Sequence, residues 1–487
     1  MAVAIATAFT AKQSAAVSLA PAAGEAAPSH PTGCTCIHCI AGHSHVGAAG
    51  PGEGTGEEEG TGEAEAALFQ FSDSRRFSSS AITGSGTSLG DPITMTWGFV
   101  RDGTGISNQG VPATESTDNS SLIAMLDNGF SVPQQDRVDD LTDRPWFAIF
   151  EESFDRFAQL SGLSYVYEPN DDGVVNGVQN FSSRIDSNTP GGVSGVRADF
   201  RIGGHSIDGG GASVVAYNWF PPNGEMVLDT DNASTYSSDN ITFRNILMHE
   251  HGHGLGIAHV EPRNGTKLME PFISTAFEGP QIDDIQAIHR GYGDVYEKSN
   301  SGAGNDSFNF ATPLGAVVNT TVSIGVDGGE TGSAFEVTPD EVDFISIDDN
   351  SDVDYLSFTL TGLSEVDLLL TPVGGQYASR VQDSNATNDF LNSPITDFTA
   401  RSNLSLTLFD TDGTTPLAFE NSGGLGDAEA VSGMTLDAGT YFVRVLGGNN
   451  TVQLYQLDVT ASLIPEPSAL ALAWLAGAGI AACRGRG

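Results

Sequence analysis

Three histidines and one glutamate in a short stretch of this chain have the types and spacing of a catalytic zinc site. His249 and His253 are four residues apart, so on a helix they share one face, where two neutral imidazoles can bind one metal ion. Gly256 lets the backbone leave that helix through a left-handed conformation and bring His259 back as a third ligand. Glu250 can reach the open side of the metal and take a proton from a water molecule there. Three protein ligands leave a fourth position open, which is typical of catalytic zinc.

The same stretch resembles the extended zinc signature of the metzincin metallopeptidases. Met269 fits the methionine turn of that family, in which the methionine lies under the zinc, and Pro271 matches the matrixin branch. Residues 281–293 also resemble the final matrixin helix, so the resemblance covers most of residues 91–294. It implies one catalytic zinc on the three histidines, with Glu250 as general base, in an enzyme that hydrolyses peptide bonds.

The elements that position these residues can also be predicted. Residues 93–100 alternate as an opening strand, and an aromatic stripe along residues 145–160 predicts an amphipathic helix. The matrixin resemblance implies an α+β domain over residues 77–297, a twisted mixed sheet with three main helices. We interpret His251, which points to the helix face opposite His249, as a packed or solvated residue rather than a ligand, and we interpret His289 in the same way.

Residues 211–218 resemble the edge strand on which matrixins bind their substrates. An extended peptide can pair with such a strand as an additional strand across the zinc. The residues expected to pair with substrate are Val214, Val215, Ala216 and Tyr217.

Beyond the catalytic zinc, we expect a calcium site but no structural zinc. Matrixins bind a structural zinc nearby, but Tyr217 and Val227 take the places of its histidines, so we expect no structural zinc although His205 remains. Four acidic residues match calcium-binding positions of matrixins with differing closeness, and oxygen-rich glycine loops suit that cation. These candidate calcium ligands, which are alternatively ordinary turn residues, are Asp199, Asp208, Glu225 and Asp229.

A second domain follows a polar linker at residues 298–306. Short alternating strands separated by Gly, Asn and Asp predict an all-β sandwich over residues 307–462. This part resembles the bacterial pre-peptidase C-terminal domain. It would bind matrix, assist export, or serve as a stabilising spacer.

Both ends of the chain have unusual composition. Residues 1–76 form a low-complexity pro-region, in which Cys34, Cys36 and Cys39 would act as a zymogen switch on the zinc or form a separate metal clip or disulfide. Residues 463–487 resemble a PEP-CTERM sorting signal, with the alternative of a plain anchor. The apolar start of the chain could belong to a signal peptide, or the true start lies upstream.

The formal net charge of −42 disfavours binding to nucleic acid and to anionic membranes, although such a charge is also typical of a solvated surface. We therefore expect a monomeric bacterial zinc endopeptidase, exported to the medium or cell surface. Its partners would be a protein or peptide substrate and a sorting transpeptidase-like enzyme, with transient membrane contact through the C-terminal segment. The competing interpretation is a non-catalytic matrix-binding or adhesion protein on a peptidase scaffold.

Overall fold

The computed structural model describes residues 70–71, 76–106, 114–173, 191–209, 214–260, 267–329, 336–378 and 395–465. The cysteine cluster and the apolar run of the C-terminal segment lie outside these residues. Within them, no helix has the length and apolar character needed to cross a bilayer.

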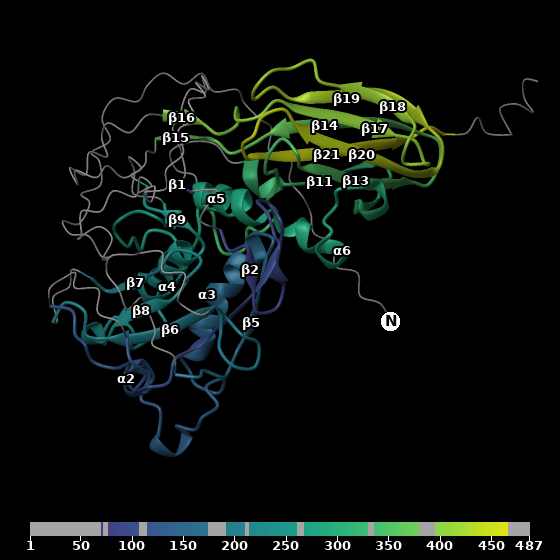
Figure 1. Ribbon diagram of the computed structural model, residues 1–487. Helices are drawn as coiled ribbons and strands as arrows, with labels where there is room; N and C mark the ends of the chain where they lie inside the picture. The colour runs from purple at the N-terminus through teal and green to yellow at the C-terminus, as the bar shows by residue number, and fades with distance from the viewer. Residues whose placement is uncertain are drawn as a thin grey trace, which may run out of the picture.

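The first half of the molecule is built on a five-stranded sheet in the order β5-β4-β6-β8-β7 (Figure 1). Four of its strands are parallel, and β7 pairs antiparallel with β8 at one edge. The strands are β4 (Ile93–Phe99), β5 (Leu163–Tyr167), β6 (Phe200–His205), β7 (Ala216–Asn218) and β8 (Met226–Asp229). Two small pairs accompany the sheet: β1 (Gln70–Phe71) with β9 (Ile257–Ala258), and β2 (Ser79–Ser80) with β3 (Gly84–Ser85).

Helices complete this half. They are α2 (Leu122–Gly129), α3 (Phe147–Leu160), α4 (Ile241–Gly254) and α5 (Ile282–Tyr292). The predicted aromatic stripe is confirmed, because every aromatic residue of residues 145–160 is buried, at Trp146, Phe147, Phe150, Phe154 and Phe157. These rings pack with Trp97 and Phe99 of β4 and with Phe243 of α4, so burial of one helix face joins the sheet to the histidine-bearing helix.

The second half is a β-sandwich of two five-stranded sheets. One has the order β10-β13-β20-β17-β18, and the other β11-β21-β14-β19 with β12 also paired to β21. Exposure alternates along β13 and β14, as expected for strands with one face in a core. The strands are β10 (Thr312–Ala316), β11 (Thr320–Ile324), β12 (Ile345–Ile347), β13 (Val353–Leu360), β14 (Ser364–Pro372), β17 (Leu404–Phe409), β18 (Pro416–Glu420), β19 (Glu429–Leu436), β20 (Gly439–Gly447) and β21 (Gln453–Leu463). The predicted α+β class with an all-β second part is confirmed.

The two halves share a buried junction. All 11 residues of α5 are buried, and this helix lies between the first sheet and the sandwich (Figure 1). A separate hydrophobic cluster combines residues of both halves: Leu160, Ile282, Ile285, Val337, Phe344, Val373, Tyr377, Phe398 and Leu454. Tyr377 belongs to a two-stranded pair that extends from the sandwich, β15 (Gln376–Ala378) with β16 (Ile395–Asp397).

Short helical segments connect the halves. They are η4 (Val295–Lys298), α6 (Ser299–Gly302) and η5 (Phe308–Phe310). Lys298 Nζ donates to the carbonyl oxygen of Leu163 at 3.0 Å, and Asn305 is fully buried. The segment expected to be a linker is therefore attached to the body of the protein at Lys298 and Asn305, while residues 300–303 are exposed.

Candidate functional site

The three predicted zinc ligands converge. His249 and His253 lie one turn apart on α4, and His259 follows the β9 strand. The Nε2 atom of His259 is 3.2 Å from Nε2 of His249 and 3.0 Å from Nε2 of His253. All three side chains are buried. Among the described residues, this is the one group of histidines whose nitrogens meet closely enough to share an ion.

The hydrogen bonds of these rings fit a divalent metal. Nδ1 of His249 lies 2.7 Å from the carbonyl oxygen of Leu268, and Nδ1 of His253 lies 2.8 Å from that of Ile257. Since a carbonyl oxygen only accepts, these contacts assign the proton to Nδ1 and the lone pair to Nε2. Burial also lowers the pKa of His249 to about 4, which favours the neutral ring. Converging neutral nitrogens of this kind are the donor set of a catalytic zinc.

Two glycines allow this geometry. Gly256 has a φ of 106°, which turns the chain from the end of α4 toward His259, as the sequence predicted. A Cβ atom at Gly252 would lie 2.5 Å from Sδ of Met269. The thioether of the methionine turn therefore packs directly on the backbone of the helix that carries two of the ligands. A backbone hydrogen bond from Val260 N to Met269 O, 2.9 Å long, ties the two segments together.

Glu250 is buried beside the histidines, with a side chain that is only 1% exposed. Burial raises its pKa to about 8, and a backbone hydrogen bond from Asn218 opposes this increase. Its Oε2 atom has no hydrogen-bond partner among the described residues. The arrangement provides a strongly basic carboxylate with one oxygen available to a further ligand.

The predicted substrate strand lies at the edge of the sheet. Ala216, Tyr217 and Asn218 form β7, which pairs on one side with β8. Val214 and Val215 precede the strand, and the carbonyl oxygen of Val215 accepts from Asp229 N at 2.8 Å. Because Asn218 reaches Glu250, the end of this edge strand lies at the zinc ligands.

The remaining two predicted packed histidines are buried. His251 lies among the rings of Phe154, Phe157 and Phe200, and its Nε2 atom is 2.5 Å from the hydroxyl of Tyr165. His289 bridges the halves of the molecule, with one ring nitrogen 2.7 Å from the carbonyl oxygen of Leu160 and the other 2.9 Å from Ser346 Oγ.

All four carboxylates expected to bind calcium accept hydrogen bonds from protein donors, including Val214 N on Asp208 at 3.2 Å and Ile207 N on Asp229 at 3.1 Å. Asp199 accepts hydrogen bonds from Thr96 N, Thr96 Oγ1 and Ala81 N, and Glu225 accepts from Arg201 at 3.0 Å. Asp208 and Asp229 lie near each other. Burial raises the pKa of Asp229 to about 6, and the Asp208 carboxylate adds to this increase. Among the described residues, the four do not form one group of potential metal ligands.

The three residues considered for a structural zinc, His205, Tyr217 and Val227, make hydrogen bonds or apolar contacts in the structure. His205 Nε2 lies 3.1 Å from Glu115 Oε1, which also accepts from the hydroxyl of Tyr217 at 3.0 Å. Tyr217 is paired with Val227 across β7 and β8, and both side chains belong to a hydrophobic cluster with Trp219.

A second group of potential metal ligands lies at the junction of the halves and was missed by sequence reasoning. Glu297, Asp306 and Asp352 each place a carboxylate oxygen within 4.8 Å of the others. Burial and neighbouring carboxylates raise the pKa of Glu297 to about 11 and that of Asp352 to about 8. The sequence feature that could have predicted this group is the high density of aspartates in residues 348–354. An asparagine and an aspartate also end the expected linker.

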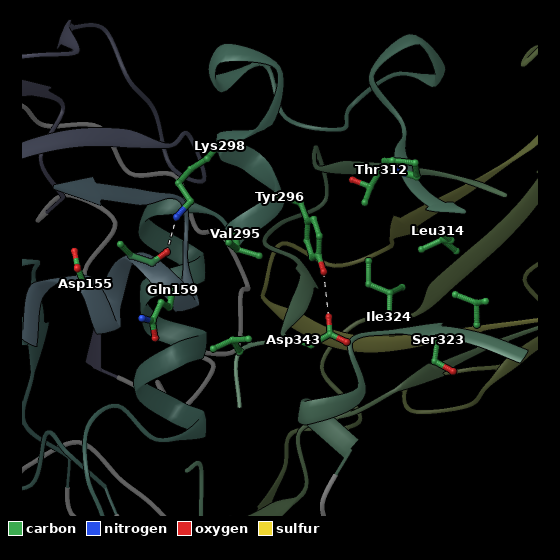
Figure 2. Close-up of a pocket in the computed structure, with 14 residues that line it drawn as sticks. Asp155, Gln159, Val295, Tyr296, Lys298, Thr312, Leu314, Ser323, Ile324 and Asp343 are labelled. Carbon is green, nitrogen blue, oxygen red and sulfur yellow. Dashed lines mark hydrogen bonds between the residues drawn. The ribbon is translucent and has the colours of Figure 1, made fainter. Parts of the chain in front are cut away.

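A groove also lies at this junction, between α3 and strands β10 and β11 (Figure 2). Tyr296 crosses it and donates to Asp343 at 3.1 Å, while Asp155 and Lys298 line its other side. In the part of the chain that the structure describes, none of the predicted zinc ligands lines this groove.

Comparisons with known proteins agree with the histidine site. The matrixin family model matches residues 197–293. That range contains the three histidines, Glu250 and Met269, and it supports a zinc metallopeptidase at the family level. No curated protein matches the chain. Among solved structures, the pre-peptidase C-terminal domain of a collagenase from Bacillus anthracis is similar, at 14% identity, a TM-score of 0.17 and coverage of 31% of this chain and 94% of that chain.

Proposed function

We propose that this protein is a zinc-dependent endopeptidase. The observation that carries the proposal is the convergence of three buried imidazole nitrogens beside a buried carboxylate. Zinc on His249, His253 and His259 would supply a Lewis acid with one open position for the reacting groups.

Glu250 performs the proton transfers in this proposal. Its carboxylate takes a proton from the water that attacks the peptide carbonyl, and the protonated side chain later gives that proton to the departing amine. The buried setting that raises its pKa to about 8 makes it a stronger base than an exposed glutamate. Asn218 holds one side of the carboxylate through its backbone N–H, which leaves Oε2 for the proton.

The substrate is an extended segment of a protein or peptide. It would pair with the edge segment Val214 to Tyr217 on the side that faces away from β8, because an extended chain satisfies its backbone groups by joining a sheet edge. β7 ends at Asn218, next to Glu250, so a peptide on this edge passes the proposed base.

We extend the proposal to calcium at Asp208 and Asp229. These two carboxylates lie near each other, with Asp229 as the last residue of β8, whereas the Glu225 carboxylate already pairs with the guanidinium of Arg201. A hard cation would offset the burial and the carboxylate repulsion that raise the pKa of Asp229. Elemental analysis of wild type and Asp229→Asn tests this, because the variant should lose one equivalent of calcium and retain zinc.

The proposed enzyme is exported and made as a zymogen. This part rests on sequence alone, since Cys34, Cys36, Cys39 and the sorting-like segment lie outside the described residues. If one cysteine blocks the zinc, replacing all three with serine should release activity without cleavage; a clip or disulfide would leave activity unchanged.

The alternative, a matrix-binding protein on an inactive peptidase scaffold, is less favoured because both the ligands and the base are present and converge. A chain from Gln70 to Pro465 would contain the described elements and can be assayed with casein and a peptide library. We expect cleavage that stops when a zinc chelator is added and returns with zinc. Stoichiometric zinc without cleavage of any peptide would favour the scaffold alternative.

A further inference from the structure

A column of three side chains connects the β-sandwich to the methionine turn. The rings of Tyr377 and Phe398 are stacked, with centroids 4.0 Å apart and an angle of 4° between their planes. Nζ of Lys267 lies over the opposite face of this stack, 4.4 Å from the centroid of the Tyr377 ring. Lys267 is only 2% exposed, which is unusual for a lysine. The contact is therefore a buried cation–π interaction between the two halves of the molecule.

The Phe398 end of the column is fixed to the sandwich. Phe398 N donates to Gly375 O at 2.9 Å, which closes the short extension that carries both rings. Gln453 on β21 donates through Nε2 to the carbonyl oxygens of Phe398 and Val373, each at 3.1 Å. Tyr377 is thus held by a central strand of the sandwich.

The Lys267 end of the column is connected to the proposed zinc ligand His249. Lys267 directly precedes Leu268, whose carbonyl oxygen lies 2.7 Å from Nδ1 of His249. Leu268 N donates to Asp284 at 3.0 Å, and Lys267 N donates to Glu270 at 2.7 Å. The position of the Lys267 side chain is therefore coupled, through one peptide unit, to the carbonyl that orients His249.

The charges around Lys267 explain how the Tyr377 ring can fix the position of its side chain. The buried carboxylates of Glu270, Asp283 and Asp284 all lie near enough to interact with its ammonium group. A lysine stem is flexible, so attraction from several carboxylates does not select one rotamer. A rigid aromatic face opposite them does, because it restricts the ammonium to one side.

We propose that Tyr377 of the β-sandwich is a positioning residue for the metal site, which acts through Lys267 and the Leu268 carbonyl to hold His249 for zinc. The inference rests on the proposed function for the role of His249. It assigns to the sandwich a part in metal retention, beyond that of a spacer or a matrix-binding module. Loss of a partner that orients a metal ligand typically weakens metal binding 10- to 100-fold.

The test compares zinc release from variants of the full chain. Protein loaded with zinc is mixed with a chromogenic chelator, and the rate of zinc transfer is measured together with the melting temperature. Tyr377→Leu should release zinc about tenfold faster, since Tyr377 is one contact further away than the direct partners of the ligands. Tyr377→Phe keeps the ring face and should behave like wild type.

A matched control separates positioning from general destabilisation. Tyr441 is also a buried, stacked tyrosine of the sandwich, but it belongs to the core cluster within that half and not to the junction cluster. Tyr441→Leu should lower the melting temperature without changing zinc release. Equal zinc release from Tyr377→Leu and Tyr441→Leu would overturn the proposal.

A double-mutant cycle tests the route. If Tyr377 acts through Lys267, the leucine substitution should have little further effect on zinc release in a Lys267→Met background. Additive effects would overturn the route through Lys267.

Failure of the proposed function can be distinguished from failure of this inference. If the proposed function is wrong, the wild-type protein binds no zinc or cleaves no peptide. If only this inference is wrong, the wild-type protein is active and the variants release zinc at the wild-type rate.

Discussion

The histidine site and the acidic group at the junction, which consists of Glu297, Asp306, Asp352 and the neighbouring Asp294, both contain buried titratable residues, yet burial has opposite consequences in them. In the first, burial lowers the pKa of His249 to about 4, and the neutral ring is the form that binds zinc. In the second, burial raises the pKa of Asp352 to about 8 and that of Asp294 to about 7. The favoured form there is the protonated acid, which is a poor metal ligand. Burial therefore prepares nitrogen ligands for a metal at neutral pH and opposes oxygen ligands.

The largest expected effect concerns the histidine site. Glu250→Ala should reduce peptide hydrolysis by about 10²- to 10⁴-fold, because the general base is lost, while the three nitrogen ligands remain. Activity is measured with the best peptide substrate, and zinc is measured by elemental analysis. One equivalent of zinc lost along with activity would make Glu250 a ligand rather than the base.

An intermediate effect is expected on the pH dependence of stability, through the acidic group at the junction. The folded pKa values of Asp294 and Asp352 lie above the usual unfolded value near 4, so the folded state binds more protons between these limits. The free energy of unfolding should therefore decrease as the pH rises from 5 to 8. We expect metal-free protein to melt on the order of 5 °C higher at pH 5.5 than at pH 8.

The control for this prediction removes one titrating group. Asp352→Asn should flatten the pH dependence, whereas Asp412→Asn, at an exposed residue whose pKa is lowered to about 2 by Thr415, should not. A wild-type melting temperature that rises toward pH 8 would contradict the predicted protonation of the junction.

The smallest expected effect is that of His251→Phe, and His253→Phe on the same helix is its contrast. His253→Phe should abolish zinc binding, but His251→Phe should keep zinc and activity, because His251 lies on the opposite face among aromatic rings. The second variant should lose about 1 kcal/mol of stability, since the Tyr165 hydroxyl loses its acceptor. Adding Tyr165→Phe should restore part of that loss. Zinc loss from His251→Phe would show that the two faces are not independent.

Local sequence was enough to predict the histidine site. The spacing of His249 and His253, the turn at Gly256 and the downstream Met269 all act within about one helix and one loop, where geometry follows from the backbone. The aromatic stripe of α3 and the alternation of β13 were predictable for the same reason. Local sequence did not resolve the calcium assignment. Whether Asp199 can bind a cation depends on Thr96, which is distant in sequence, and whether Glu225 can do so depends on Arg201 of a neighbouring strand.

The sequence by itself determined the identity and spacing of the proposed zinc ligands, the base and the two types of sheet. Only the tertiary structure decided that the sandwich is packed onto α5, that Tyr377 covers Lys267 beside Met269, and that Glu297 lies near Asp306 and Asp352. Periodicity reports which face of an element is buried, but it carries no information on which partner covers that face. Contacts between the two halves, such as Lys267 with Tyr377, exist only once both halves have folded and docked.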